Sequence, residues 1–305
     1  MRCLIFFLLA LAAVPAIPAA HASEIAELAR QEERLAAVAH RLTTASAAWC
    51  PKLEVQPGWV LGDLRRFAAR EQEAARLVYG AGDAPFVAAV APGSPADRAG
   101  LTRGTRIAAI GSTPVPAPGD GPTMRIDAAI VLTGRLDPAA PLTVTDTAGV
   151  VRRLDPAPGC ASAFRIERSG VQAAANGILV RLRFDLAAGI ADEAELAAVV
   201  AHELAHNILR HRERLAGDRS VARVQATEIE ADRLAVWLMT DAGYDPLAAV
   251  RFWQRHKRPL IRAATHPPRR ERIAAIEAEL AAMRAARAAD PAARPPLVAA
   301  LPPLE

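Results

Sequence analysis

Three polar side chains interrupt an apolar helical stretch in the second half of the chain. The sequence from Ala197 to His211 reads AAVVAHELAHNILRH, and within it His202, Glu203 and His206 form the pattern HExxH. At about 3.6 residues per turn, positions four apart lie on one helix face, so both imidazoles can bind the same metal ion. Glu203 is rotated by roughly 100° from His202 and can address a metal-bound water. The pattern therefore indicates a metal centre with a carboxylate beside it.

The five-residue pattern alone does not establish such a centre. From average residue usage, it arises by chance in on the order of one chain per hundred of this length. Two buried, hydrogen-bonded histidines in an ordinary core helix remain the alternative, and purified protein without zinc would support it. A third metal ligand elsewhere in the chain would separate the two interpretations.

Within the same stretch, the candidates for a third ligand are weak. His211 follows His206 by five residues and is expected to point elsewhere on one long helix from Asp192 to about Arg214. The metzincin pattern requires Gly at position 209 and His at position 212, but the chain has Leu209 and Arg212 there. That class of site is excluded.

The next helical stretch, ATEIEADRLAVWL, offers a better ligand. Glu228 and Asp232 are four residues apart and share a helix face, whereas Glu230 is rotated by about 200° from Glu228 and falls nearly opposite. A set of two His and one Glu leaves the fourth zinc position for water, as a catalytic site requires. Asp232 lies one turn further on, where it can orient a ligand imidazole.

HExxH followed by ExxxD on a second helix, in the wording EIEADRLA, resembles the zinc metallopeptidases of the HtpX and CAAX prenyl protease kind. The stretch DEAELAAVVAHELAHNILRH is similar to that family's active-site helix, and Thr265-His266-Pro267 with Arg272 downstream resembles its His-Pro segment. The resemblance spans about residues 176–280. It implies one Zn²⁺ per chain held by His202, His206 and Glu228, with Glu203 as general base, Asp232 behind the ligands, and His266 and Arg272 stabilising the oxyanion or binding substrate.

The resemblance also implies a fold and an activity. It predicts an α+β fold with a mainly helical zincin-type peptidase domain that contains a small sheet and hydrolyses peptide bonds. Further helices are expected at about residues 226–240 and 269–289, and the strand GILVRLRF is expected to pair with an extended peptide. The family's best-known members span the membrane several times. This chain lacks those helices and is similar to an exported branch that degrades misfolded or unassembled envelope proteins; prenylated substrates have no support in the sequence.

The region from about Val55 to Pro158 has a different sequence pattern, in which Gly and Pro separate short β-like runs. Its centre, FVAAVAPGSPADRAGLTRGTRIAAIGSTPV, resembles a bacterial PDZ domain, with AAIVLTG in its second helix. A helical stretch, DLRRFAAREQEAARLVYG, stands where the carboxylate-binding loop should be, so Trp59–Gly62 is expected to supply that loop. Such domains bind peptides by adding a strand to a sheet edge. The alternatives are a module that only covers or positions the next domain and, for the whole chain, a PDZ-mediated, chaperone-like protein with little proteolytic turnover.

The first residues, MRCLIFFLLALAAVPAIPAAHASE, have the layout of a secretory signal peptide with cleavage expected after Ala22. An uncleaved anchor is the alternative, but the apolar run is shorter than the roughly 20 residues that span a bilayer. We therefore expect export to the periplasm or cell envelope of a bacterium, as a soluble or peripheral protein without a stable membrane span after cleavage. Cys3 leaves with the signal peptide. Cys50 and Cys160 then remain as one pair, expected to form a disulfide rather than two buried thiols.

The composition suits a globular protein, with 52% hydrophobic and 23% charged residues in a chain of 305. A formal net charge of only +4 gives no reason to expect nucleic acid as a partner. The expected partners are protein and peptide substrates and a peptide ligand of the PDZ-like domain. The expected order along the chain is a signal peptide (1–22), an N-terminal helical segment (23–54), the PDZ-like domain (55–158), the zinc metallopeptidase domain (159–287) and a flexible Pro- and Ala-rich tail (288–305).

Overall fold

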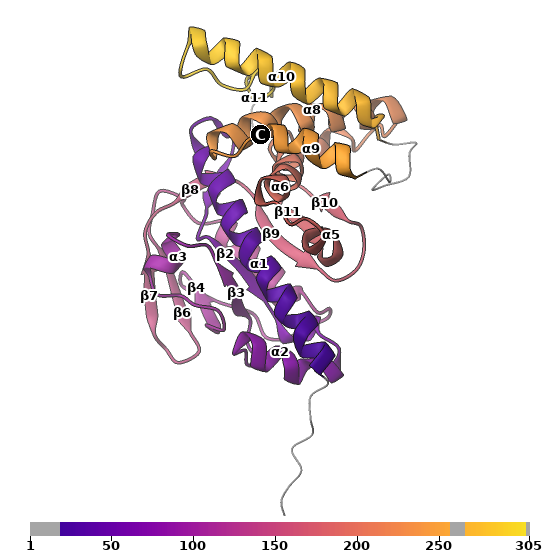
Figure 1. The fold of residues 1–305 in the computed structure, drawn as a ribbon. Coiled ribbons are helices and arrows are strands. Elements are labelled where there is room, and N and C mark those ends of the chain that lie inside the picture. The colour runs from indigo at the N-terminus through magenta and orange to yellow at the C-terminus, as the bar shows by residue number, and fades with distance from the viewer. Residues whose placement is uncertain (1–18, 257–265, 303–305) are drawn as a thin grey trace, which may run out of the picture.

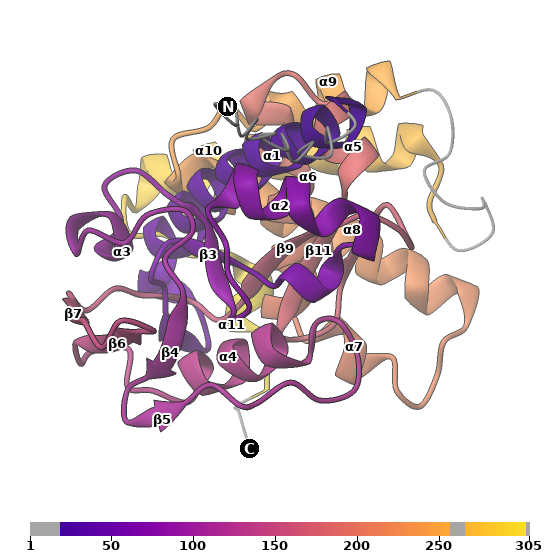
Figure 2. The same cartoon turned by 90° about the horizontal axis from the view of Figure 1, so that it is seen from below.

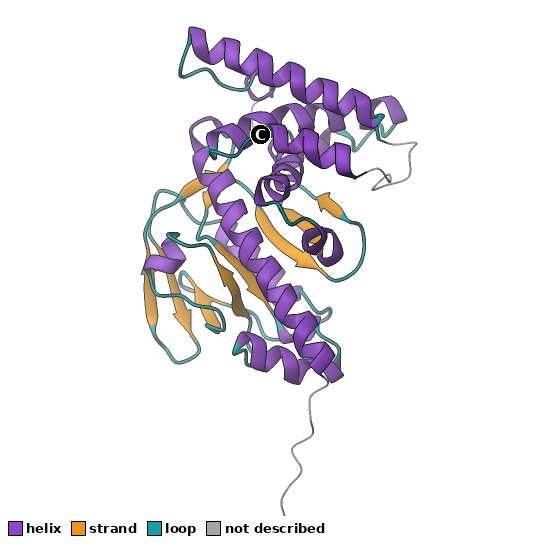
Figure 3. Cartoon of the chain, in the orientation of Figure 1, coloured by secondary structure: helices purple, strands orange, loops and turns teal. Residues whose placement is uncertain are grey.

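The computed structural model describes residues 19–256 and 266–302. The apolar run of the predicted signal peptide and Thr265 of the His-Pro segment lie outside the described residues. The molecule combines helices with several small sheets, most of them antiparallel, which is an α+β arrangement (Figure 3). Within the described ranges, no helix is both long and apolar enough to cross a membrane.

The first half of the chain forms strands at the runs expected from its Gly and Pro punctuation. β2 pairs with β3, and a separate four-stranded sheet has the order β5-β4-β6-β7. Val87, Ile107 and Ile126 belong to the hydrophobic cluster of this half, and none is more than 1% exposed. The order of elements is compatible with the predicted PDZ-like domain, and that assignment stays a prediction. The elements are β1 (Leu53–Val55), β2 (Trp59–Gly62), α2 (Gln72–Tyr79), β3 (Phe86–Val90), α3 (Pro95–Arg98), β4 (Ile107–Ile110), β5 (Thr113–Pro114), α4 (Met124–Gly134), β6 (Leu142–Asp146), β7 (Val151–Leu154) and β8 (Pro158–Cys160), with short 3₁₀ turns at Ala47–Trp49, Leu64–Arg66 and Ala69–Glu71.

The second half is mainly helical around a small sheet. Its three strands have the order β10-β11-β9, with β11 parallel to β9 and antiparallel to β10. Helices α8, α9 and α10 lie together beyond α6 (Figure 1). The elements are β9 (Ala163–Glu167), β10 (Ala173–Ala175), β11 (Leu179–Arg183), α5 (Phe184–Gly189), α6 (Glu193–Ile208), α7 (His211–Arg214), α8 (Val221–Asp241), α9 (Leu247–Arg255), α10 (Arg269–Ala289) and α11 (Pro296–Ala299).

A long helix, α1 (Ala19–Ala45), connects the two halves (Figure 1). Leu35, Val38 and Leu42 are fully buried, and their spacing of three and four residues places them on one helix face. Through this apolar stripe α1 packs against β3 and α2 of the first half and against β9 and α6 of the second. The view from below shows α1 and α2 side by side (Figure 2). The helix starts before Ala22, so it includes the predicted cleavage point; cleavage itself stays a prediction.

The helix that carries HExxH is shorter than predicted. The expectation of one helix to about Arg214 is wrong, because α6 ends at Ile208 and a separate turn, α7, begins at His211. Arg210 between them has a φ of 53°, a left-handed conformation that is unfavourable for a residue with a side chain. The break redirects the chain, so His211 does not continue the helical spiral of His206.

The strand expected to bind an extended peptide also needs correction. β11 contains most of the run GILVRLRF, but it lies in the middle of its sheet with β9 on one side and β10 on the other. Its backbone groups are therefore already used on both sides. The edge strands of this sheet are β9 and β10, and β10 was not predicted from the sequence.

Cys50 and Cys160 form a disulfide that ties the end of the α1 region to β8. Their Cα atoms are 5.4 Å apart, and the bond closes a loop with a sequence separation of 110 residues. Beside it, the Gln56 side chain donates hydrogen bonds to the carbonyl oxygens of Cys160 and Ser162, at 3.0 and 3.3 Å. These contacts hold the first half of the chain against the start of β9.

Replacing both cysteines with Ser is expected to lower the free energy of unfolding. The chain-entropy model gives about 4–5 kcal/mol for a loop of this length, because the reduced unfolded chain is freer. Urea denaturation of the Cys50→Ser/Cys160→Ser variant beside the oxidised protein measures the difference. Equal unfolding midpoints would show that the bond does not stabilise the fold.

Candidate metal centre

The polar residues of HExxH lie on a helix that is otherwise embedded in the core. Asp192 directly precedes α6, and its side chain accepts a hydrogen bond from the Ala194 backbone N–H and caps the helix. Leu196, Val200 and Leu204 have no exposed surface. This apolar packing fixes the helix, and its contact with α8 brings the predicted ligands from both helices together.

His202, His206 and Glu228 form a compact cluster of three metal-binding side chains. Each offers one ligand atom, and these atoms all lie within 4.8 Å of one another. The two Nε2 atoms are 3.1 Å apart, and they lie 3.4 and 3.5 Å from the Glu228 carboxylate oxygens. A His, His, Glu set matches three-ligand catalytic zinc sites that keep one position for water.

The far side of each imidazole also has a partner. His202 Nδ1 is 3.0 Å from Asp232 Oδ1, and His206 Nδ1 is 2.8 Å from His211 Nδ1. With protons on both Nδ1 atoms of the ligand rings, both Nε2 lone pairs point at each other and at the Glu228 carboxylate. Three electron-rich groups converging on one point favour a cation between them, so the donor set fits a zinc ion.

The charges of the cluster are strongly perturbed. Burial and the Arg272 charge disfavour a proton on His202, but hydrogen bonds with Asp232 and Glu228 and the Asp232 charge outweigh them and raise the pKa of His202 to about 9. Burial and the neighbouring His202 charge hold the pKa of His206 well below its usual range. Burial opposes ionisation of Glu228, yet both histidines and Arg272 together lower its pKa. The metal-free cluster therefore favours positive charge beside an ionised Glu228, as a cation site should.

Glu203 lies next to the ligands in the same cleft. Its side chain is buried, and burial is the main cause that raises the pKa of Glu203 to about 7. The Glu228 charge raises this pKa further, whereas His202 opposes the rise. A carboxyl group with a pKa near the working pH can both accept and return a proton, which general base catalysis requires.

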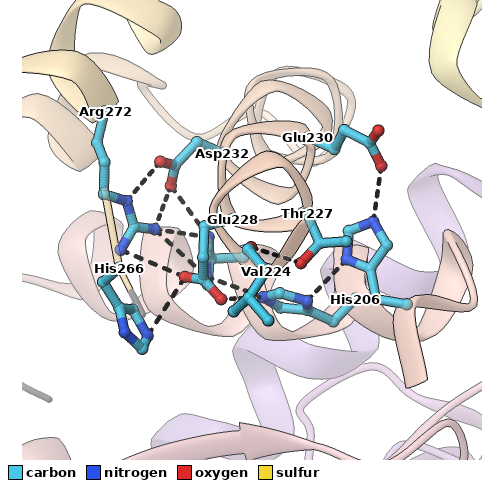
Figure 4. A network of polar contacts seen from close by, with 10 residues as sticks. His206, Val224, Thr227, Glu228, Glu230, Asp232, His266 and Arg272 are labelled. Carbon is cyan, nitrogen blue, oxygen red and sulfur yellow. Dashed lines mark hydrogen bonds and ion pairs between the residues drawn. The ribbon is translucent and has the colours of Figure 1, made fainter. Parts of the chain in front are cut away.

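Arg272 supports the metal cluster from behind. Its guanidinium donates two hydrogen bonds of 2.6 Å to the Asp232 carboxylate and lies 4.0 Å from the centre of the Trp253 ring. Because Asp232 in turn contacts His202, the three residues form a connected chain that ends at the ligand. Figure 4 shows Arg272 and Asp232 on one side of Glu228.

His266, from the predicted His-Pro segment, also lies beside the cluster. Its Nε2 atom is 3.6 Å from the Glu228 carboxylate, and its side chain is about 24% exposed at the cleft. The structure thus brings His266, Arg272 and Asp232 to the same centre as the three predicted ligands (Figure 4).

A cleft of about 630 Å³ opens over the cluster. The segment 171–177, which includes β10, lines one part of the cleft, and apolar side chains of α5, α6, α8 and α9 line other parts. Pockets of this size accept several residues of a polypeptide or a drug-sized ligand. Outside segment 171–177, the apolar lining residues are Leu186, Ala198, Val199, Leu215, Val224, Ala235, Ala249, Phe252 and Trp253.

Three features of the centre were missed in the sequence: the contact of His211 with His206, the role of Glu230 and the β10 edge. Glu230 was placed opposite Glu228 on α8, but His211 and Arg214 reach it from α7 at 3.0 and 2.6 Å. Helical spacing placed Glu228 on the face that meets the two histidines, but it gave no partner for Glu230 on the opposite face. The missing information was the chain reversal at Arg210, for which the sequence has no glycine to indicate it.

Comparisons with known proteins agree with this geometry. Residues 219–280 match the family model of Peptidase family M48, an interval that includes Glu228, Asp232 and Arg272. The mitochondrial metalloendopeptidase OMA1 of Schizosaccharomyces pombe is 31% identical over 118 residues, a match that covers 27% of this chain and 35% of the yeast protein. The chain thus spans about a third of the length of that relative. Both findings support a metal-dependent peptidase, and peptidases of family M48 use a metal that is usually zinc.

Proposed function

We propose that this protein is a zinc-dependent metalloendopeptidase whose metal is held by His202, His206 and Glu228, with Glu203 as the general base. The observation that carries the proposal is the convergence of the three ligand atoms at the floor of a 630 Å³ cleft, with a buried carboxyl group beside them. The M48 match over α8 supports the peptidase class. Hydrolysis of an unfolded protein such as casein, lost with a chelator and restored by zinc, tests it.

Each protein group has a distinct part in the reaction. Zinc, when bound, would lower the pKa of a water to about 7 and polarise the scissile carbonyl. Glu203 accepts the proton as the water oxygen bonds to the carbonyl carbon, and it returns that proton to the leaving amine as the C–N bond breaks. Asp232 and Arg272 hold the His202 ring in place. His266, at the edge of the cleft, is placed to contact the substrate carbonyl oxygen.

The substrate backbone binds to the open edge of β10. In the antiparallel pair with β11, Arg183 donates to Gln172 and Asn176 donates to Leu179. Because hydrogen-bonded pairs alternate, the backbone groups of Ala173 and Ala175 point away from β11, toward the free edge along the cleft. An extended peptide can add there as a further strand. Small side chains along β10 leave room for the substrate's own side chains.

The Ala173→Pro variant is expected to bind substrate more weakly. Proline removes the outward N–H without removing a bond to β11, and an edge strand tolerates it. Loss of one backbone hydrogen bond should raise KM about 10-fold with little change in kcat. Steady-state kinetics on an unfolded protein measure this, with Ala173→Ser as a control that keeps the N–H. Equal KM values for the Pro and Ser variants would place the substrate elsewhere.

The proposal extends to location and substrate. The N-terminal pattern and the disulfide, which forms in oxidising compartments, support export to the periplasm or envelope of a bacterium. Misfolded or unassembled envelope proteins offer the extended backbone that the β10 edge can bind. Cell fractionation of the tagged full chain tests the location, and its recovery in the cytoplasm would contradict the proposal.

A binding module with little turnover, in which the PDZ-like domain holds a peptide, is the alternative function. The cavity beside β2 is only about 50 Å³, and residues of α1, α4 and β9 line it. Arg165 of β9 is buried and contacts Asp127 of α4 at 2.6 Å, across this region. Peptide-sized pockets are several-fold larger. A chelator-insensitive holding activity on an unfolded outer-membrane protein, without cleavage, would nevertheless favour the alternative.

A further inference from the structure

We propose that Glu230 and His211 are positioning residues that fix His206 in the tautomer that presents its Nε2 lone pair to the metal. The inference rests on the proposed function in that it takes His206 as a metal ligand. It adds a second outer support to the centre, on the opposite side from Asp232 and Arg272. Figure 4 shows Glu230 on the far side of Glu228 from these two residues.

The contact depends on the break in the helix. The left-handed conformation of Arg210, with a φ of 53°, starts α7 in a new direction and turns His211 back toward α6. The His211 and His206 rings meet edge to face with centroids 4.8 Å apart, and His211 is only 2% exposed. A backbone conformation that costs free energy is retained where it places a residue usefully.

The positions of the protons follow from the partners at each end. Two Nδ1 atoms 2.8 Å apart can form a hydrogen bond only if one donates and the other accepts. His211 Nε2 lies 3.0 Å from the Glu230 carboxylate, which only accepts, so His211 carries its proton on Nε2. In a neutral His211 ring the Nδ1 atom is then an acceptor, and His206 must donate from its own Nδ1. This leaves His206 Nε2 without a proton, directed at the metal cluster.

The reverse arrangement is disfavoured at both ends. If His211 donated from Nδ1, its bare Nε2 would face the Glu230 carboxylate, and two electron-rich atoms 3.0 Å apart repel each other. His206 would then carry its proton on Nε2, 3.1 Å from His202 Nε2, where it would block metal binding. The carboxylate of Glu230 therefore selects the tautomer of a ring that it does not touch.

Contacts around the relay favour an ionised Glu230 beside Arg214 and a neutral ring for His211, which is almost fully buried. Arg214 donates to both carboxylate oxygens, at 2.6 and 3.1 Å. His211 thus accepts the Nδ1 proton of His206, as Asp232 accepts the Nδ1 proton of His202.

The test measures zinc affinity rather than activity, by competition with a chromophoric chelator. His211→Phe keeps a ring but removes the acceptor, and it should weaken zinc binding about 10–100-fold, as outer partners of metal ligands do. His211→Asn restores an acceptor oxygen at nearly the position of Nδ1, so it should keep an affinity within about 3-fold of the wild type. Glu213→Gln, on the exposed side of the same turn, is the matched control and should bind zinc as the wild type does.

A spectroscopic measurement adds a readout that a merely structural role would not change. In ¹⁵N spectra of the zinc-loaded full chain, His206 should carry its proton on Nδ1, and in metal-free His211→Phe protein the preference for that tautomer should be lost. A folded His211→Phe variant with wild-type zinc affinity, or an Asn variant no tighter than the Phe variant, would overturn the inference. If His211→Phe does not fold, Glu230→Gln decides: about 10-fold weaker zinc binding is expected, and wild-type affinity overturns the inference. Absence of zinc binding in the wild type would instead refute the proposed function.

Discussion

The Glu203→Gln variant is expected to lose peptide hydrolysis by about 10²–10⁴-fold while it still binds zinc. The amide has nearly the shape of the carboxyl group but cannot accept the proton of the attacking water. Zinc should remain, because Glu203 is not among the three residues whose ligand atoms converge. Initial rates on casein and zinc content of the same preparation give both quantities.

A matched variant and a stability measurement complete this test. Glu193→Gln makes the same chemical change at an exposed position of α6 and should leave the rate unchanged. The Glu203→Gln protein should also be at least as stable as the wild type, so unfolding would not explain its inactivity. Substantial hydrolysis by Glu203→Gln would remove this residue from the mechanism.

The stability difference should depend on pH with a defined sign. Burial raises the pKa of Glu203 from 4.5 to about 7, so the folded metal-free protein holds a proton that the unfolded chain releases. The contribution of Glu203 to the free energy of unfolding is therefore lost as pH rises from about 4.5 to 7, and it stays constant above that. Glu203→Gln lacks this dependence. Without metal, the thermal midpoint of Glu203→Gln should exceed that of the wild type by a margin that grows as pH rises from about 4.5 to 7. A margin that does not change with pH would contradict a raised pKa of Glu203.

The second large effect is expected for Glu228→Ala, which should lose zinc and hydrolysis together. Loss of a residue that only hydrogen-bonds to a metal ligand weakens metal binding by up to roughly 100-fold. Removal of Glu228 should weaken zinc binding by more than this, because Glu228 is the carboxylate among the three proposed ligands. The two variants therefore differ in their zinc content: Glu203→Gln should lose hydrolysis but keep zinc, whereas Glu228→Ala should lose both. Chelator competition and casein hydrolysis measure the two effects on one preparation.

The control for Glu228→Ala is Glu277→Ala, which removes an exposed carboxylate from α10. It should keep zinc and activity. A Glu228→Ala protein that binds zinc with unchanged affinity would show that the third ligand lies elsewhere, and His266, 3.6 Å from the same carboxylate, would then be the next candidate.

Helical spacing predicted the parts of the site that lie on uninterrupted helices. It placed His202 and His206 on one face of α6, and Glu228 and Asp232 on one face of α8, and the structure has all four at the same centre. The expected helix at 269–289 has the same limits as α10. In these segments local periodicity and tertiary packing favour the same arrangement, so the pattern is sufficient.

The sequence failed where tertiary contacts outweigh local preference. Ala173–Ala175 favours helix, yet it forms β10 because β11 offers its edge. Arg210 adopts a left-handed conformation without being glycine, and the helical projection of His211 was therefore wrong. Both errors concern backbone that packing against the rest of the molecule determines, and both bear on how the site binds its metal and substrate.

The central claim is most directly tested by the zinc stoichiometry of the purified full chain, measured in parallel for the wild type and for His206→Ala. We predict one zinc per wild-type chain, removed by a chelator with loss of casein hydrolysis and restored with it, and no stoichiometric zinc in the variant. A wild-type protein that hydrolyses casein without zinc, or a His206→Ala protein that retains one zinc per chain, would contradict the account.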